Sequence, residues 1–195
     1  MRSYEEESRM DQVAQMVTAA RRCFSIDKLI EFAQSDYAQV RRSAMCNPRI
    51  TREILELALR DTDIPVRRKV ASNRNSDEKI LLLALKDKNL MVACAAAINP
   101  SASKKVIEKA LRSKEQAIRS CAITNPSISP ISLMIPLDDE DSVNAQLAAK
   151  MLYKRLTEMG FIDEQDEDSW AQGVIKDPIM RLSIKAKVAS SKDKK

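Results

Sequence analysis

The chain has 195 residues, of which 44% are hydrophobic and 4% are aromatic, and it contains only two glycines. This length and composition favour a single all-α domain and exclude most β-rich folds. The chain contains no histidine, the commonest general base in enzymes, and its net charge is +5. We therefore expect a protein that is not an enzyme.

The N-terminal segment, residues 1–39, is predicted to form a capping helix and a degenerate first repeat. Val13, Met16, Val17 and Ala20 follow one face of a helix. The acidic residues 1–11 do not resemble a secretory signal, and no stretch reaches the roughly 18 apolar residues of a membrane span. We expect a cytoplasmic protein that does not interact with a membrane.

The central segment, residues 40–142, repeats itself. Asparagines recur with a spacing of 26 residues, at Asn47, Asn73, Asn99 and Asn125. Four residues after each asparagine stands a good helix N-cap: Thr51, Asp77, Ser103 and Ser129. Such a period indicates four copies of one supersecondary unit, and it directs the functional question to a surface rather than an active site.

Each unit is predicted to be a pair of short helices joined at the asparagine. Ile54, Leu55, Ala58 and Leu59 form the apolar stripe of one second helix, and the next units repeat it. Helices of about ten residues are marginal alone, so the units must stack. We interpret the four asparagines as a structural ladder, in which each ends a first helix in the left-handed conformation and bonds to corner backbone, including that of the next unit.

The repeated pattern, for example Val-Arg-Arg-Lys-Val-Ala-Ser-Asn-Arg-Asn-Ser-Asp-Glu-Lys-Ile-Leu-Leu-Leu-Ala-Leu-Lys-Asp from residue 66, resembles the leucine-rich repeat variant family, a HEAT-like class. The resemblance covers residues 40–143 and extends weakly upstream. It implies a right-handed α-solenoid of short helical pairs. The end units of such a stack need covering, and the apolar stripes near both termini predict a helical cap at each end. Some members of that family hold an iron–sulfur cluster on clustered cysteines, a motif that this chain lacks.

The cysteines do not form a recognisable metal-binding motif. They are scattered at Cys23, Cys46, Cys94 and Cys121, without any Cys-x-x-Cys pair. A zinc site would have to gather four thiolates from distant units. We therefore expect free thiols, no metal and no cofactor.

Positive charge is concentrated in the repeats. Residues 40–135 hold 18 Lys and Arg against 9 Asp and Glu. The candidate partner-binding residues are Arg41, Arg42, Arg67, Arg68, Lys104, Lys105 and Arg119. An alternative interpretation is structural: the arginines bond to aspartates or carbonyl groups of the preceding turn and tie the units together.

The C-terminal part is predicted to begin with a capping helix over residues 143–160, which Gly160 ends. Residues 161–195 then follow as an acidic linker and a basic, partly disordered tail, in which Ile179, Leu182 and Ala186 have helical spacing. A sharper hypothesis is that the acidic residues 163–168 fold back onto the basic repeats, anchored by Trp170, and are autoinhibitory.

Two functions remain open at this point. The favoured one is a non-enzymatic scaffold or adaptor that binds an acidic surface of a protein partner through the solenoid. The alternative is sequence-independent binding of duplex nucleic acid through its phosphates. Residues 40–135 contain no aromatic side chain that could stack on bases, which leaves only backbone contacts for that alternative.

Overall fold

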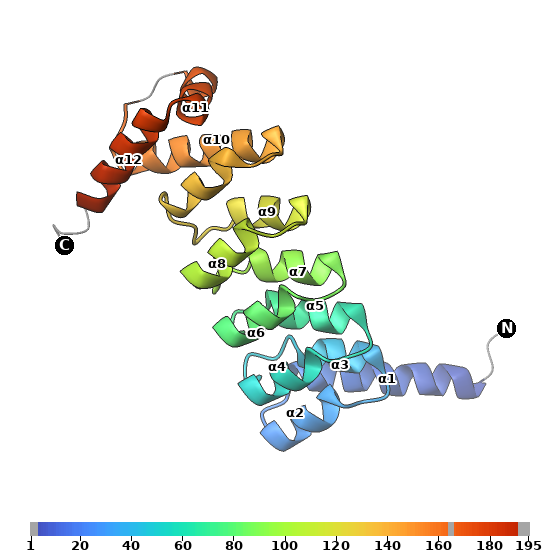
Figure 1. Ribbon diagram of the computed structural model, residues 1–195. Helices are drawn as coiled ribbons and strands as arrows, with labels where there is room; N and C mark the ends of the chain where they lie inside the picture. Colours follow the sequence, from blue (N-terminus) through green and yellow to red (C-terminus); the bar gives the residue numbers. More distant parts are fainter. Residues whose placement is uncertain (1–3, 164–165, 191–195) are drawn as a thin grey trace. The chain divides into compact units, whose positions relative to one another are not determined.

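A computed structural model of the protein describes residues 4–163 and 166–190. Within these ranges the chain is all-helical and contains no strand (Figure 1). The helices form two compact units, Met1–Ser101 and Ala102–Lys195. None of the described helices is long and apolar enough to cross a membrane.

The first unit contains seven short or medium-length helices within its described part. Their bounds are α1 Tyr4–Arg22, α2 Ile26–Ala33, α3 Ala38–Ala44, α4 Arg52–Ala58, α5 Ile64–Ser72, α6 Glu78–Ala84 and α7 Leu90–Ala97. Helices α1, α3, α5 and α7 pack in succession, each against the next, and α6 packs on both α5 and α7 (Figure 1). The predicted N-terminal helix is confirmed as α1, whose Ala20 is fully buried.

Local sequence explains where the helices of this unit begin. Asp63 caps α5 by accepting a hydrogen bond from the N–H of Val66, and Asp77 caps α6 in the same way. Pro65 occupies the first turn of α5, where its missing N–H costs nothing. Thr51 precedes α4 but makes no capping bond, contrary to our prediction.

The core of the first unit consists of the predicted apolar stripes. Ile54, Leu55 and Ala58 of α4 are buried, and the equivalent residues of α6 are fully buried. Val66 and Val70 of α5 face them at 0% exposure. Burial of each Val, Leu or Ile side chain contributes roughly 1.5–3 kcal/mol, and no single helix could bury its stripe alone.

The second unit is built from five α-helices and one 3₁₀ helix within its described residues. They are α8 Lys104–Leu111, α9 Gln116–Ile123, η1 Ser132–Asp138, α10 Ser142–Glu158, α11 Glu167–Lys176 and α12 Pro178–Ser190. The 3₁₀ helix replaces the expected second helix of the fourth repeat because Pro136 lies inside it and lacks the N–H that an α-helix requires. A helix, α10, is present in the segment predicted as the C-terminal cap, and Gly160 follows it with a φ of 70°.

The predicted acidic linker was wrong in part. Asp166 caps α11, and Trp170 is buried against Tyr153 of α10 at a ring-centroid distance of 5.4 Å. Asp168 pairs with Lys150 of α10 at 2.6 Å. Trp170 therefore anchors α11 to α10 and not to the basic repeats, which removes the contact on which the autoinhibition hypothesis depended. The predicted disorder of residues 191–195 lies outside the described residues.

Candidate interaction surface

The corner asparagines of the first unit connect successive corners. Asn99 is 1% exposed, and its Nδ2 donates to the carbonyl oxygens of Ala71 at 2.7 Å and Asn73 at 2.9 Å. Asn47 donates in the same way to Ala20 and Cys23, and Asn73 donates to Met45. These contacts form a ladder from each corner to the corner before it, so our expectation of a bond to the next unit had the wrong direction.

The asparagines do not adopt the left-handed conformation that we predicted. No described non-glycine residue has a positive φ, and Asn73 has φ −73° and ψ 134°. Each Oδ1 instead accepts the N–H two residues later, at 2.8 Å for Asn47, Asn73, Asn99 and Asn125. Because this side-chain turn reverses the chain with ordinary backbone angles, a left-handed residue is unnecessary.

The arginines in equivalent positions are clamped inside the fold. Arg67 bonds Asp87 through Nε at 2.7 Å and through Nη2 at 3.0 Å, and its Nη1 donates to the carbonyl of Asp61 at 2.8 Å. Arg41 with Asp61 and Arg119 with Asp139 repeat this geometry. Each clamp ties three chain segments together through charge-assisted bonds.

Burial and charge identify these clamps as structural. The side chains of Arg67 and Asp87 are 8% and 9% exposed. Hydrogen bonds from Arg67 lower the pKa of Asp87 below its ordinary value, although burial acts in the opposite direction. For Asp61 and Asp139, burial raises the pKa, but the arginine and backbone hydrogen bonds outweigh it and the pKa is lowered.

These lowered pKa values predict loss of stability in acid. A carboxylate with a lowered pKa stabilises the fold fully above its pKa in the unfolded chain, about 3.9, and this contribution disappears as the pH falls through the folded-state pKa. We expect the free energy of unfolding to stay level down to about pH 5 and to fall steeply below about pH 4. Urea unfolding across a pH series measures this, and a loss centred near neutral pH would contradict it.

Our partner-binding assignment is therefore corrected for most of the arginine row. Arg41, Arg67 and Arg119 are clamped, and Arg42 forms a bidentate pair with Asp63 at 3.0 Å. The carbonyl contacts with the preceding turn agree with the structural interpretation, whereas the paired aspartates lie in the following turn. The guanidinium groups of the three clamped arginines are largely buried and are not available to phosphates or to a partner, whereas the side chain of Arg42 remains 40% exposed.

A sequence signal for the clamps was present but was not used. Each clamped arginine has an aspartate 20 residues later, and the repeat that has Ala93 in the arginine position has Ser113 in the aspartate position. Arginine and aspartate are thus absent together. This joint absence indicates that the arginine and the aspartate form a pair, each present because of the other.

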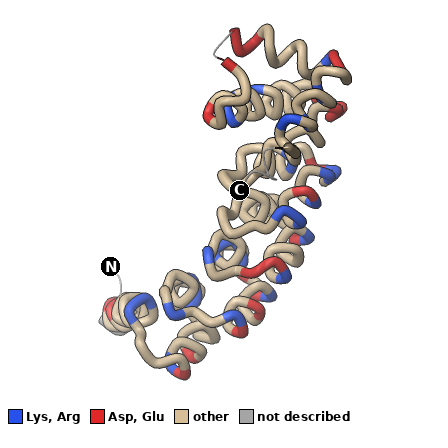
Figure 2. Tube along the Cα trace, turned by 90° about the vertical axis from the view of Figure 1, so that its left-hand side faces the viewer, with Lys and Arg blue, Asp and Glu red and all other residues tan. Residues whose placement is uncertain are grey.

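Three of the predicted basic residues remain at the surface. Arg68 is exposed on α5, beside exposed Lys69, and forms no ion pair within the described residues. Lys104 is 68% exposed and lies 3.7 Å from Glu108 of its own helix, and Lys105 is also exposed. The lysines belong to the second unit, so the predicted site is not one continuous patch of the first unit. Basic and acidic residues are interspersed along the helices (Figure 2).

Helix α7 provides an apolar surface that sequence reasoning missed. Leu90, Met91 and Ile98 are 42%, 55% and 44% exposed. No charged residue occurs between Lys88 and Lys104, in a chain in which 31% of the residues are charged. That charge-free run was the available signal. A helix that is apolar on all sides has an outer face that favours a contact with another molecule.

Helices α5 and α7 place basic and apolar residues side by side. The two helices pack together, and the repeat puts Arg68 and Lys69 in the places that Cys94 and Ala95 occupy in α7. We define the α5–α7 face as Arg68, Lys69, Leu90, Met91 and Ile98. Its chemistry is an apolar patch with two cations along one side.

The described residues contain no group of three or more His, Cys, Asp or Glu side chains that could hold a metal ion. None of the four cysteines, all within the described residues, forms a disulfide bond, and all are of intermediate burial. No family model matches the chain, and a search of curated proteins found no match. The resemblance to leucine-rich repeat variants therefore stays a prediction.

Proposed function

We propose that the helical pairs form an α-solenoid with a 26-residue period and that the protein is a non-enzymatic scaffold for a partner protein. The proposal is supported by the recurrence of the asparagine and arginine contacts at this spacing within the first unit. Solenoids stack short units so that equivalent positions form extended surfaces, which commonly bind other proteins. Cytoplasmic location and absence of membrane contact are part of this proposal.

The observation that carries the proposal is the exposed apolar face of α7. Met91 and Ile98 leave about half of their surface in water although the helix supplies buried residues on its other side. Exposed apolar patches rimmed by polar residues mark protein interaction sites more often than nucleic-acid sites. We therefore place the partner on the α5–α7 face.

The partner is expected to combine apolar and acidic side chains. Its apolar residues would cover Met91 and Ile98, and its carboxylates would meet Arg68 and Lys69 on the adjacent helix. Arginine suits this role because its planar guanidinium group can donate two hydrogen bonds to one carboxylate. Water would be excluded from the apolar centre while the charges fix the orientation of the partner.

Duplex binding is the weaker alternative. It depended on a row of free arginines, and Arg41, Arg42, Arg67 and Arg119 are bound to aspartates instead. Arg68, the exposed arginine of that row, and its neighbour Lys69 lie on the helix that packs beside apolar α7, and a phosphate backbone does not complement an apolar surface. No contact in the described residues favours nucleic acid over protein.

Site-specific cross-linking tests the proposed surface. Ser72 is exposed on α5 and occupies the position equivalent to Ile98, so a photo-reactive residue there reports on the face without removing it. We expect a protein adduct in a lysate of the source cells that survives nuclease treatment. Met91→Asp or Arg68→Glu should each reduce the adduct about tenfold, because central contacts dominate such interfaces.

The control for this experiment is the same photo-reactive residue at Lys79 on α6, which is 64% exposed and lies outside the α5–α7 face. It should give no adduct that depends on Met91. Equal adducts at both positions, or an adduct unchanged in the two variants, would overturn the proposed surface. Loss of the adduct after nuclease treatment would favour the nucleic-acid alternative.

A further inference from the structure

Helix α12 presents an apolar stripe that nothing in the described structure covers. Ile179 and Leu182 are 76% and 65% exposed, and Ala186 is exposed on the same side. These are the residues whose helical spacing suggested a packing face, yet the buried residues of α12 are Ile184 and Val188. Because contiguous apolar patches on a surface mark interaction sites, the stripe is a candidate contact with another molecule.

The stripe is surrounded by positive charge. Helix α12 contains Arg181, Lys185 and Lys187 and no acidic residue. Arg181 bonds Asp138 and the carbonyl groups of Val174 and Ile175, whereas Lys185 and Lys187 are exposed. A surface that complements α12 therefore has an apolar centre and acidic surroundings.

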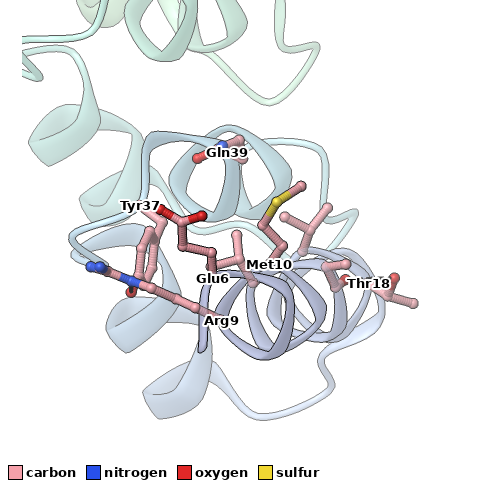
Figure 3. A pocket seen from close by; sticks show the side chains of 9 residues that line it. Glu6, Arg9, Met10, Thr18, Tyr37 and Gln39 are labelled. Carbon is pink, nitrogen blue, oxygen red and sulfur yellow. Dashed lines mark hydrogen bonds between the residues drawn. The ribbon is translucent and has the colours of Figure 1, made fainter. Parts of the chain in front are cut away.

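A groove of that description lies between α1 and α3 of the first unit. It has a volume of about 890 Å³, and Met10, Val13, Ala14 and Val17 supply its apolar lining. Arg9 closes one side by donating to the hydroxyl of Tyr37 at 3.0 Å (Figure 3). Glu6 lines the groove, and Glu7 and Asp11 of the same helix are exposed.

The groove and the helix agree in length and spacing. The lining residues of α1 span 13 residues, from Glu6 to Thr18, and α12 also has 13 residues, so at 1.5 Å per residue each segment extends over about 20 Å. Met10, Val13 and Val17 have the same i, i+3, i+7 spacing as Ile179, Leu182 and Ala186. Two such stripes pack as a helix pair, with the lysines of one facing the acids of the other.

We propose that this protein associates with itself by docking α12 of one copy into the α1–α3 groove of a second copy. The two surfaces are different, so the contact is heterologous, and each copy offers one of each kind. Association is therefore open-ended and rises with concentration. A single helix in a groove buries less surface than a standard stable interface, so dissociation to monomers on dilution is part of the proposal.

The test is the molar mass of the full chain in solution over a range of concentrations. We expect the mass to rise above 21.9 kDa as concentration increases, and to rise less in high salt, which screens the charges. Leu182→Asp on the helix and Met10→Asp in the groove should each weaken association at least about tenfold. The matched control is Leu83→Asp, at a residue 49% exposed on α6, which should associate like the unchanged chain.

Mixing the two variants gives the sharpest result. Met10→Asp retains an intact α12 and Leu182→Asp retains an intact groove, so an equimolar mixture should form a discrete dimer although neither variant associates alone. A chain that stays monomeric at millimolar concentration would overturn the proposal, as would a mixture that fails to form the dimer. Binding of the monomer to anionic vesicles, lost in Leu182→Asp, would likewise overturn it and assign the stripe to a lipid surface.

Discussion

An Arg67→Met substitution is expected to lower the free energy of unfolding by about 3 kcal/mol or more, because it leaves a buried carboxylate without its cation. Methionine keeps the length of the side chain and most of its packing. Asp87 would retain only the N–H of Asn89, at 2.8 Å, and the carbonyl groups of Asp61 and Thr62 would lose their donor. Urea unfolding followed by far-ultraviolet circular dichroism measures the loss.

The matched control for Arg67→Met is Arg68→Met, on the next residue of the same helix. Arg68 is exposed and forms no ion pair within the described residues, so its replacement should change stability by less than about 0.5 kcal/mol. Arg67→Ala/Asp87→Ser, which imitates the repeat with Ala93 and Ser113, should recover more than half of the loss because no unpaired charge remains. Equal losses in the two methionine variants would contradict a structural role for Arg67.

An Asn99→Ala substitution is expected to cost about 3 kcal/mol, since buried backbone groups lose their partners. The amide of Asn99 donates to Ala71 and Asn73 and accepts from the N–H of Ser101 at 2.8 Å. Alanine supplies none of these bonds, and the site is 1% exposed, so water replaces them poorly. The same urea experiment measures the effect.

Asn75→Ala is the control for the corner asparagine. Asn75 is exposed, and its amide makes one long contact, 3.5 Å, with the carbonyl of Pro48. We expect its replacement to change stability by less than about 0.5 kcal/mol. If Asn99→Ala were as mild as Asn75→Ala, the corner bonds would not hold the repeats together, and the ladder would be an incidental feature of the fold.

Much of the fold was predictable because it follows local rules. The helix caps at Asp77 and Ser103 and the apolar stripes of α4 and α6 depend on residues within one or two turns. The spacing of the asparagines predicted that they share one role. It did not predict that each bonds to the preceding corner, because that direction depends on how the units stack and no local pattern encodes stacking.

The arginine clamps were harder to predict because their partners are distant in sequence. Two basic residues at the start of a helix suit a binding row and an internal ion pair equally well. The pair between Arg67 and Asp87 becomes visible only when the repeats are aligned and the loss of both residues, at Ala93 and Ser113, is noticed. Arg68 is exposed in the structure, and it is the arginine of this row for which we still propose partner binding.

In the C-terminal helices, the sequence did not predict which residues are buried. The described residues of the acidic run are exposed, but the run continues into α11, which buries Trp170, Ala171 and Val174. In α12 the spacing of Ile179 and Leu182 correctly predicted a helix. These two residues are exposed, however, and the buried side of the helix is a different one. Periodicity predicts that a helix has an apolar face. It does not predict which of two apolar faces meets the rest of the chain.

Our central claim is that two neighbouring arginines of α5 have different roles. We propose that Arg67 stabilises the fold and that Arg68 contacts a partner. The most direct measurement compares Arg67→Met with Arg68→Glu, recording both the free energy of unfolding and the yield of the Ser72 cross-link. We expect Arg67→Met to be destabilised by about 3 kcal/mol, and Arg68→Glu to stay folded while its adduct falls about tenfold. An Arg68→Glu protein that unfolds as readily as Arg67→Met, or that keeps the full adduct, would contradict the claim.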